Sequence, residues 1–314
     1  MPMNWFDSLP RALLAVSLLF GGSAAYANTA PAPINLNSFD AAKTRVKLPN
    51  GQILAYIEMG RHDGQPVLLV HGYTDNARDW VPLIPYLSPD FRLIVVDIRG
   101  HGQSSKPECC YTRLDFAYDL KLLLDHLKIQ RADIVGHSLG SMIAQSFAEF
   151  WPEHTGKIVL ISSTGGQKAN PSPEELKQRK DGFDFRTPIR QLHDPIDPNS
   201  AFMKEWWSSP TPVDPDFLRR QREDAARIPA KVWLAILDQG LSSNDLQATL
   251  PRLTEPTLLI WGGKDPIMLP ENRQTLRDAL PKAEVKIFPD YGHNPFWENP
   301  AAVAQVVNAF LAAR

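Results

Sequence analysis

At residues 136–140 the sequence reads Gly-His-Ser-Leu-Gly, and this pentapeptide stands between two segments of different periodicity. The apolar residues within 132–135 predict a short strand, and apolar side chains at helical spacing over 139–151 predict an amphipathic helix. A strand, a tight turn and a helix in this order place the middle residue, Ser138, on a sharply bent backbone. The flanking glycines leave room for strand and helix to approach each other. The stretch therefore predicts a serine nucleophile at the end of a strand.

A serine hydroxyl becomes a good nucleophile when a histidine takes its proton and a carboxylate orients that histidine. The sequence offers a candidate for each role. Asp265 follows the apolar run 256–261 and a Gly-Gly pair, and His293 follows the predicted strand 285–288. Functional residues concentrate in such loops. The predicted catalytic residues are therefore Ser138, Asp265 and His293.

Two other acids lie near His293 in the sequence. Asp290 precedes it by three residues, so we expect it on the same loop, as a turn residue, rather than across the imidazole. Glu298 is expected to be a solvated or helix-start charge. The sixth predicted strand, 158–165, ends in Ser-Ser-Thr-Gly and offers no acid. Asp265 remains the favoured partner of the histidine.

Two upstream apolar runs also end at glycine-containing loops. Residues 67–70 precede His-Gly-Tyr-Thr-Asp at 71–75, and residues 93–96 precede Asp-Ile-Arg-Gly-His-Gly-Gln-Ser at 97–104. Such runs are typical of strands covered on both faces by helices. From about residue 43 to 311 the chain resembles the α/β-hydrolase fold family, whose members carry a His-Gly motif after the third strand and Arg-Gly-x-Gly-x-Ser after the fourth. It is most similar to the capped group of haloperoxidases (perhydrolases), enol-lactonases and carbon-carbon bond hydrolases.

This resemblance implies a mostly parallel central sheet flanked by helices, with a helical cap inserted after the sixth strand. It also implies that the backbone amides of Tyr73 and Leu139 form the oxyanion hole. The phenol of Tyr73 either projects into the pocket or packs beside its loop, and the sequence leaves both open.

The predicted cap covers residues 166–253, which are too many for a loop and lack the Val/Ile runs of the core. Trp206 and Trp207 are the cap residues that we expect to line the pocket. Helices are predicted within the cap at 173–181, 215–227 and 230–241.

The N-terminus has the three regions of a secretory signal peptide: residues 1–11 ending in Arg, an apolar run over 12–20, and Ala-Tyr-Ala at 25–27. The apolar run is far shorter than the ~20 residues of a membrane-spanning helix, so an uncleaved anchor is the less favoured alternative. The protein is therefore expected to be periplasmic or secreted, without stable membrane insertion. The predicted organisation is a signal peptide (1–27), a tether (28–42), a core in two parts (43–165 and 254–314) and the cap (166–253).

Composition limits the partners. The 314 residues carry a net charge of -2 and are 43% hydrophobic, so nothing in the charge balance attracts nucleic acid. We find no metal-ligand spacing and no nucleotide-binding glycine motif, and we expect neither a metal nor a cofactor. Cys109 and Cys110 are adjacent. They could form a strained disulfide, but two free or partly buried thiols are the favoured interpretation.

These observations predict an exported, cofactor-independent serine hydrolase that cleaves an ester or lactone bond of a small, partly apolar molecule through an acyl-enzyme. Two alternatives remain. One is perhydrolysis or carbon-carbon bond cleavage by the same three residues. The other is a ligand-binding receptor with negligible turnover, which a turnover count against chromogenic esters would distinguish.

The signal peptide generates the first prediction. Protein recovered from an exporting bacterial host should begin at Asn28 and remain in the soluble fraction, because signal peptidase recognises the small residues of Ala-Tyr-Ala. N-terminal sequencing or intact-mass measurement checks this. Retention of residues 1–27 in a membrane fraction would show an anchor instead.

Overall fold

A central eight-stranded sheet organises the protein in our computed structural model, which describes residues 31–167, 170–241 and 246–313. The strand order is β1-β2-β4-β3-β5-β6-β7-β8. β2 is antiparallel to both of its neighbours, and the remaining pairs are parallel. The strands are β1 (Thr44–Lys47), β2 (Ile53–Gly60), β3 (Gln65–Val70), β4 (Phe91–Asp97), β5 (Ala132–His137), β6 (Thr155–Ile161), β7 (Thr257–Gly262) and β8 (Glu284–Phe288).

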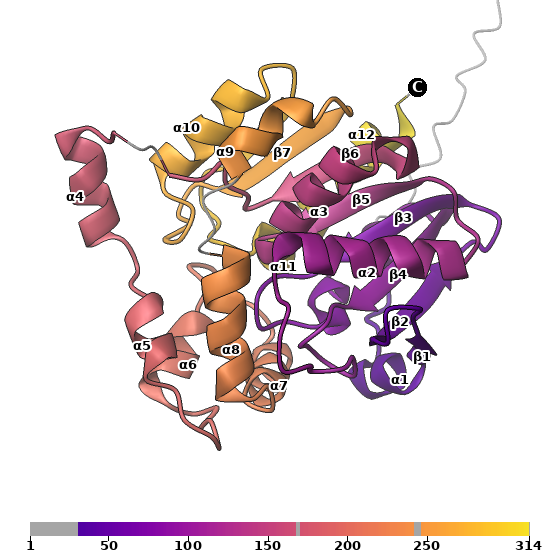
Figure 1. The fold of residues 1–314 in the computed structure, drawn as a ribbon, viewed down its shortest axis with the longest axis horizontal. Coiled ribbons are helices and arrows are strands. Elements are labelled where there is room, and N and C mark those ends of the chain that lie inside the picture. Colours follow the sequence, from indigo (N-terminus) through magenta and orange to yellow (C-terminus); the bar gives the residue numbers. More distant parts are fainter. Residues whose placement is uncertain (1–30, 168–169, 242–245, 314) are drawn as a thin grey trace, which may run out of the picture. The chain divides into compact units, whose positions relative to one another are not determined.

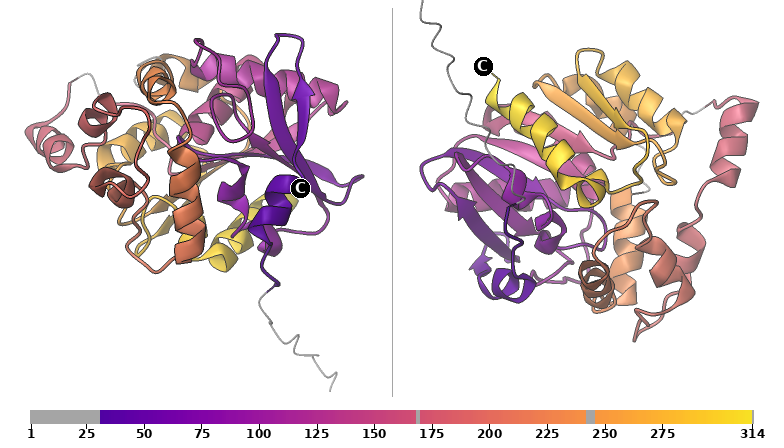
Figure 2. Two further views of the ribbon diagram at one scale, coloured as in Figure 1. Left: turned by 90° about the horizontal axis from the view of Figure 1, so that it is seen from below. Right: turned by 180° about the vertical axis from the view of Figure 1, so that it is seen from behind.

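The middle strands are buried on both faces, which explains why they read as unbroken apolar runs. Every residue of β5 and β7 is buried. Helices α2 (Arg113–His126) and α3 (Leu139–Phe150) pack against each other on one side of the sheet, and α12 (Pro300–Ala312) covers the other side (Figures 1 and 2). The mostly parallel α/β sheet predicted from the sequence is confirmed.

The chain between β6 and β7 is helical throughout its regular structure, and no strand occurs in the described part of it. The predicted helices within 173–181, 215–227 and 230–241 are all present, and the last continues as a wider helical turn to Leu241. Helices α5 to α8 form a group at one side of the sheet, and α4 stands apart from this group (Figures 1 and 2). The helices here are α4 (Pro173–Asp181), α5 (Arg186–Arg190), α6 (Ala201–Trp206), α7 (Pro215–Ala225), α8 (Ala230–Ile236) and α9 (Leu246–Thr249).

Short helices complete the core. α2 begins with a capping box, in which Thr112 and Asp115 each accept a hydrogen bond from the other's backbone amide. No helix in the described ranges is long and apolar enough to span a membrane. The predicted signal peptide, 1–27, lies outside these ranges. The remaining core helices are α1 (Leu36–Ala41), α10 (Pro270–Ala279) and α11 (Pro295–Glu298).

The predicted tether, 28–42, differs from the structure in its second half. Residues 36–41 form helix α1, because Asn35 caps it and Phe39 is buried in the core. Asp40 of α1 also pairs with Arg78 of the loop after β3. The polar, Pro-rich sequence of this segment gave no sign that Phe39 is buried or that Asp40 forms an ion pair.

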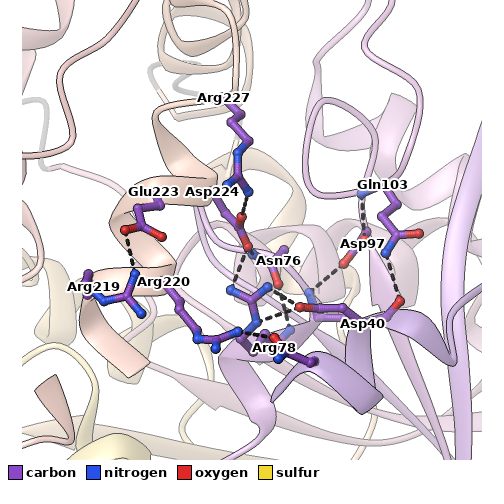
Figure 3. A network of polar contacts seen from close by, with 12 residues as sticks. Asp40, Asn76, Arg78, Asp97, Gln103, Arg219, Arg220, Glu223, Asp224 and Arg227 are labelled. Carbon is purple, nitrogen blue, oxygen red and sulfur yellow. Dashed lines mark hydrogen bonds and ion pairs between the residues drawn. The ribbon is translucent and has the colours of Figure 1, made fainter. Parts of the chain in front are cut away.

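Arg78 also ties the cap to the core. Its guanidinium lies 2.6 Å from the carboxylate of Asp224 on α7, while Asn76 donates to the same carboxylate at 3.2 Å (Figure 3). Arg78 is itself buried, so these contacts are shielded from solvent more than surface ion pairs are. One side chain thus joins α1, the loop after β3 and the cap.

Candidate active site

Ser138 occupies the turn between β5 and α3 with a strained backbone. Its φ of 49° and ψ of -117° lie outside the regions that residues with a Cβ ordinarily adopt. Its amide donates to the carbonyl oxygen of Ile161 at 2.9 Å, which fixes the turn against β6. The side chain faces the two cavities described below.

The two flanking glycines are required by contact distances. A Cβ at Gly136 would lie 2.4 Å from the carbonyl oxygen of Gly140, and a Cβ at Gly140 would lie 2.1 Å from that of Val70. These obstacles are backbone atoms, which cannot move aside as a flexible side chain can. The Gly-x-Ser-x-Gly spacing therefore reflects the close approach of α3 to β5 and β3.

Asp265 and His293 meet across the carboxyl ends of β7 and β8. The Nδ1 atom of His293 lies 2.9 Å from Oδ2 of Asp265. The other carboxylate oxygen accepts the amides of Ile267 at 2.8 Å and Met268 at 3.0 Å. Burial raises the pKa of Asp265, but the imidazole and these amides outweigh burial and hold that pKa below its usual value. The carboxylate therefore stays ionised and faces the histidine.

Further contacts fix the loop that carries His293. Its carbonyl oxygen accepts the hydroxyl of Ser162 at 2.7 Å and lies 3.1 Å from Nε2 of His137. The amide of Gly292 donates to Glu298 at 2.6 Å, and Glu298 also accepts the hydroxyl of Thr211 from the cap segment. The imidazole position is thus set by main-chain as well as side-chain contacts.

Of the two roles expected for Glu298, the helix-start charge is the one found, because Glu298 lies in the first turn of the short helix α11 and is not fully solvated. It is half-buried, and burial raises its pKa. Asp290, the competing acid, is exposed and pairs at 3.5 Å with Lys264, itself exposed. The structure therefore brings Asp265 to the imidazole and leaves Asp290 on the surface, as expected for a turn residue.

Tyr73 and Leu139 lie just beyond the carboxyl ends of the neighbouring strands β3 and β5, at equivalent positions in the strand register. The register of β3 and β5 pairs Val70 with Gly136, and each of the two residues lies three positions further on. Leu139 is the first residue of α3, so its amide has no acceptor within the helix. This amide and the loop carrying Tyr73 lie beside the Ser138 turn, where the resemblance places an oxyanion hole.

Buried histidines support these loops. His71 accepts the amide of Ile98 at 3.1 Å through Nε2, and burial lowers its pKa to about 3. His101 accepts the amide of Thr74 at 3.1 Å, and burial lowers its pKa as well. Both rings therefore stay neutral and act as hydrogen-bond acceptors for backbone amides.

The phenol of Tyr73 reaches the cap. Its hydroxyl donates to the carbonyl oxygen of Trp233 on α8 at 2.6 Å, and its ring packs edge-on against Trp206 and Trp233. The indole of Trp206 donates to the hydroxyl of Thr74 at 2.9 Å. The sequence left open whether the phenol projects into the pocket or packs beside its loop. In the structure the ring lines the cavities, and its hydroxyl is hydrogen-bonded to the cap.

Two cavities meet at Ser138. The first, of about 370 Å³, is also lined by His293, Trp207 and Trp297. The second, of about 440 Å³, extends toward α4 and α9 and is lined by Met142 and Leu246. Residues on the boundary line both cavities, and they are Tyr73, Ser138, Phe183, Trp206, Pro266 and Ile267.

The two predicted cap tryptophans occupy different environments. Trp206 is half-buried and lines both cavities. Trp207 lines the first cavity but is 3% exposed and stacks on Trp297, with ring centroids 5.8 Å apart. Trp206 is thus a wall between the cavities, whereas Trp207 mainly joins the cap to the core.

Cys109 and Cys110 are joined as a disulfide, contrary to the favoured expectation of two free thiols. Cys110 has a φ of 76°, and its carbonyl oxygen accepts from Arg99 at 2.6 Å. The loop that holds these residues is thus supported by a buried guanidinium, which the local sequence did not indicate.

Comparison with known proteins gives the family. The model of the alpha/beta hydrolase fold matches residues 65–300. The chain therefore belongs to the alpha/beta hydrolase fold family, and the resemblance drawn from its motifs is confirmed. It is a hydrolytic enzyme by this membership.

Individual relatives are similar at modest identity. The dihydrolipoyllysine-residue acetyltransferase component of the acetoin cleaving system of Pseudomonas putida is 30% identical over 83% of this chain and 67% of its own. The 2-hydroxy-6-oxononadienedioate/2-hydroxy-6-oxononatrienedioate hydrolase of Paraburkholderia xenovorans is 27% identical over 88% and 99%. The crystal structure of the enol-lactonase from Burkholderia xenovorans superposes with a TM-score of 0.68 at 23% identity, covering 86% of this chain and 100% of that one.

The contrast between the two acids generates the second prediction. Asp265→Asn should lower the turnover rate on the order of 10⁴-fold, because an amide at this place favours the wrong imidazole tautomer. Asp290→Asn is the matched control and should change the rate less than about twofold, since its carboxylate is exposed and pairs with an exposed lysine. Steady-state kinetics of both variants, with circular dichroism to verify folding, make the measurement. The reverse ranking would assign the orienting acid to Asp290.

Proposed function

We propose that the protein is a serine hydrolase that cleaves an ester or lactone bond of a small, partly apolar molecule. The observation that carries this proposal is the bond of 2.9 Å between His293 Nδ1 and the Asp265 carboxylate, in a histidine that lines the same cavity as Ser138. An orienting carboxylate on one ring nitrogen leaves the other to act as a base. The strained turn at Ser138 supports the role of nucleophile.

The chemistry proceeds in two halves. Ser138 Oγ attacks the substrate carbonyl carbon while its proton passes to Nε2 of His293, and the amides of Tyr73 and Leu139 hold the resulting oxyanion. The tetrahedral intermediate collapses, the bond to the leaving alcohol breaks, and His293 gives that oxygen its proton. Water then attacks the acyl-enzyme with His293 as base and releases the acid and the free serine. Asp265 stays ionised and stabilises the imidazolium in both halves.

The two cavities support a substrate with a group on each side of the scissile bond. Both adjoin Ser138, so one can hold the acyl part and the other the alcohol part, or the two arms of a lactone ring. Their volumes of about 370 and 440 Å³ suit small molecules. Aromatic rings between them favour apolar groups on the substrate.

The names of two relatives support hydrolysis of small molecules: one is called an enol-lactonase and the other a hydrolase of hydroxy-oxo-dioates. Two other reactions of the same three residues, perhydrolysis and carbon-carbon bond cleavage, are the alternatives to test. Hydrogen peroxide as acyl acceptor tests perhydrolysis, and a dienoic diketone tests carbon-carbon bond cleavage. Export to the periplasm or the medium is part of the proposal and is supported by the N-terminal pattern of residues 1–27.

The proposed nucleophile generates the third prediction. A fluorophosphonate probe should label the protein once, on Ser138, because only an activated serine attacks phosphorus at an appreciable rate. Ser138→Ala should abolish labelling, whereas Ser141→Ala, one turn further along α3, should keep it. Intact mass and peptide mapping make the measurement. Undiminished labelling of Ser138→Ala would refute the assignment and with it the proposed function.

The position of Trp206 between the cavities generates the fourth prediction. Trp206→Ala should move the best substrate toward bulkier esters, since buried apolar area contributes roughly 25 cal/mol per Å². Trp207→Ala should instead lower the midpoint of thermal unfolding, because it removes a stacked ring from the interface with Trp297. A series of p-nitrophenyl esters and a thermal melt distinguish the two. An unchanged size preference in Trp206→Ala would show that this indole does not limit the substrate.

A further inference from the structure

The segment after β3 and the end of strand β5 bring two carboxylates and one imidazole together beside the first cavity. Asp75 and Asp79 follow β3, and His137 ends β5 immediately before the serine. One ligand atom of each lies within 4.8 Å of the others. The sequence indicated no metal site, because its ligands come from separate segments and share no local spacing.

Each of the three residues also has one buried polar side-chain atom without a hydrogen-bond partner among the described residues. These atoms are Oδ1 of Asp75, Oδ2 of Asp79 and Nδ1 of His137. The three residues are 5%, 0% and 1% exposed, respectively. Nδ1 of His137 lies 3.6 Å from Oδ2 of Asp79, which is beyond an ordinary hydrogen bond. Buried carboxylates and imidazoles are costly when unpaired, so this arrangement needs a positive partner.

The tautomer of His137 strengthens the argument that the cluster needs a positive partner. Its Nε2 lies 3.1 Å from the carbonyl oxygen of His293, and a carbonyl oxygen can only accept. Nε2 therefore carries the hydrogen, and in the neutral ring Nδ1 presents a lone pair. That lone pair faces a carboxylate, so the point between the three side chains is surrounded by acceptors.

The outer contacts are those of a metal centre. A histidine that binds a metal usually donates its other ring N–H to a carbonyl or carboxylate, as His137 does to the His293 carbonyl. A ligating carboxylate is usually hydrogen-bonded in turn, and Oδ1 of Asp79 accepts the indole N–H of Trp297 at 2.8 Å. These two contacts fix the orientation of the imidazole and of one carboxylate independently of any ion.

We propose that Asp75, Asp79 and His137 bind a divalent cation of the Zn²⁺ type. Zinc takes imidazole nitrogen and carboxylate oxygen at about 2.0–2.2 Å, which in a tetrahedron separates neighbouring ligands by about 3.4 Å. The spacing of 3.6 Å between His137 and Asp79 fits this value. Two carboxylates and a neutral imidazole balance the charge of a divalent ion.

The site also has a route for the ion to enter and a candidate for the fourth ligand. Asp75 and His137 line the first cavity, so an ion can reach the site from solvent. The carboxamide of Gln221 on α7 is 1% exposed, and neither of its polar atoms has a partner in ordinary hydrogen-bond geometry within the described part of the chain. Gln221 lies close enough to Asp75 to lower the pKa of that carboxyl, so its oxygen or a water molecule can complete the tetrahedron.

A proton is the competing occupant. Burial and the neighbouring Asp79 raise the pKa of Asp75 well above its usual value, which favours the protonated form of this carboxyl when no cation is bound. A cation would displace that proton and would join the loop after β3, the serine turn and the His293 loop. Its expected role is to stabilise this arrangement, which does not depend on the proposed reaction.

Calorimetric titration of the full mature chain with ZnCl₂, after dialysis against EDTA, tests the proposal. We expect one Zn²⁺ per chain, confirmed by elemental analysis of the desalted protein. At free Zn²⁺ about a hundredfold above the dissociation constant, the midpoint of thermal unfolding should rise by roughly 5 °C. Co²⁺ in place of Zn²⁺ should give the visible absorption of a tetrahedral nitrogen-oxygen site.

Variants separate this site from adventitious binding. Asp75→Asn and Asp79→Asn should each weaken Zn²⁺ binding at least about tenfold. Glu205→Gln, which removes an exposed carboxylate from the wall of the same cavity, and Ser138→Ala should both bind Zn²⁺ as the parent does. Binding that is absent, or that neither Asp variant weakens, would overturn the proposal and leave a proton in the cluster. Because Zn²⁺ binding is measured without substrate, this outcome is independent of the proposed function.

Discussion

The close approach of α3 to the sheet is the constraint on which the rest of the site depends. With no side chain at Gly136 and Gly140, the helix begins directly after β5, and the intervening residue is forced to a φ of 49°. Such a conformation costs free energy that the packing around it must supply. Here a fully buried β5 and an α3 that is buried along most of its length hold the turn, so the strain at Ser138 is stored in the best-packed part of the protein.

Around this turn, function is distributed over loops that are held by buried polar contacts. The loop after β3 is held by His101, by Arg78 and by the cap, while the loop after β8 is held by Ser162, His137 and Glu298. Apart from the ion pair between Arg78 and Asp224, each of these contacts satisfies a backbone group that would otherwise be unpaired in the interior. The site is therefore positioned by main-chain hydrogen bonds as much as by its own side chains.

The sequence predicted the parts of the site that have a local signature. Apolar runs ending in glycine located β3, β4 and β7, and the pentapeptide located the turn at Ser138. The sequence could not reveal interactions between distant segments. The pairing of Asp40 with Arg78, the half-burial of Glu298 and the convergence of Asp75 and Asp79 on His137 all depend on how loops meet in space. None of these leaves a periodic or spaced pattern in one stretch of chain.

Tyr73 links binding and chemistry in a way that has a kinetic consequence. Its backbone lies beside the serine turn, while its hydroxyl holds the carbonyl oxygen of Trp233 in the cap. A substrate that displaces α8 therefore also displaces the loop that carries the Tyr73 amide, one of the two donors that we propose for the oxyanion. In the proposed reaction, one residue thus links substrate affinity to transition-state stabilisation, and changes in the cap are expected to alter kcat together with KM rather than KM alone.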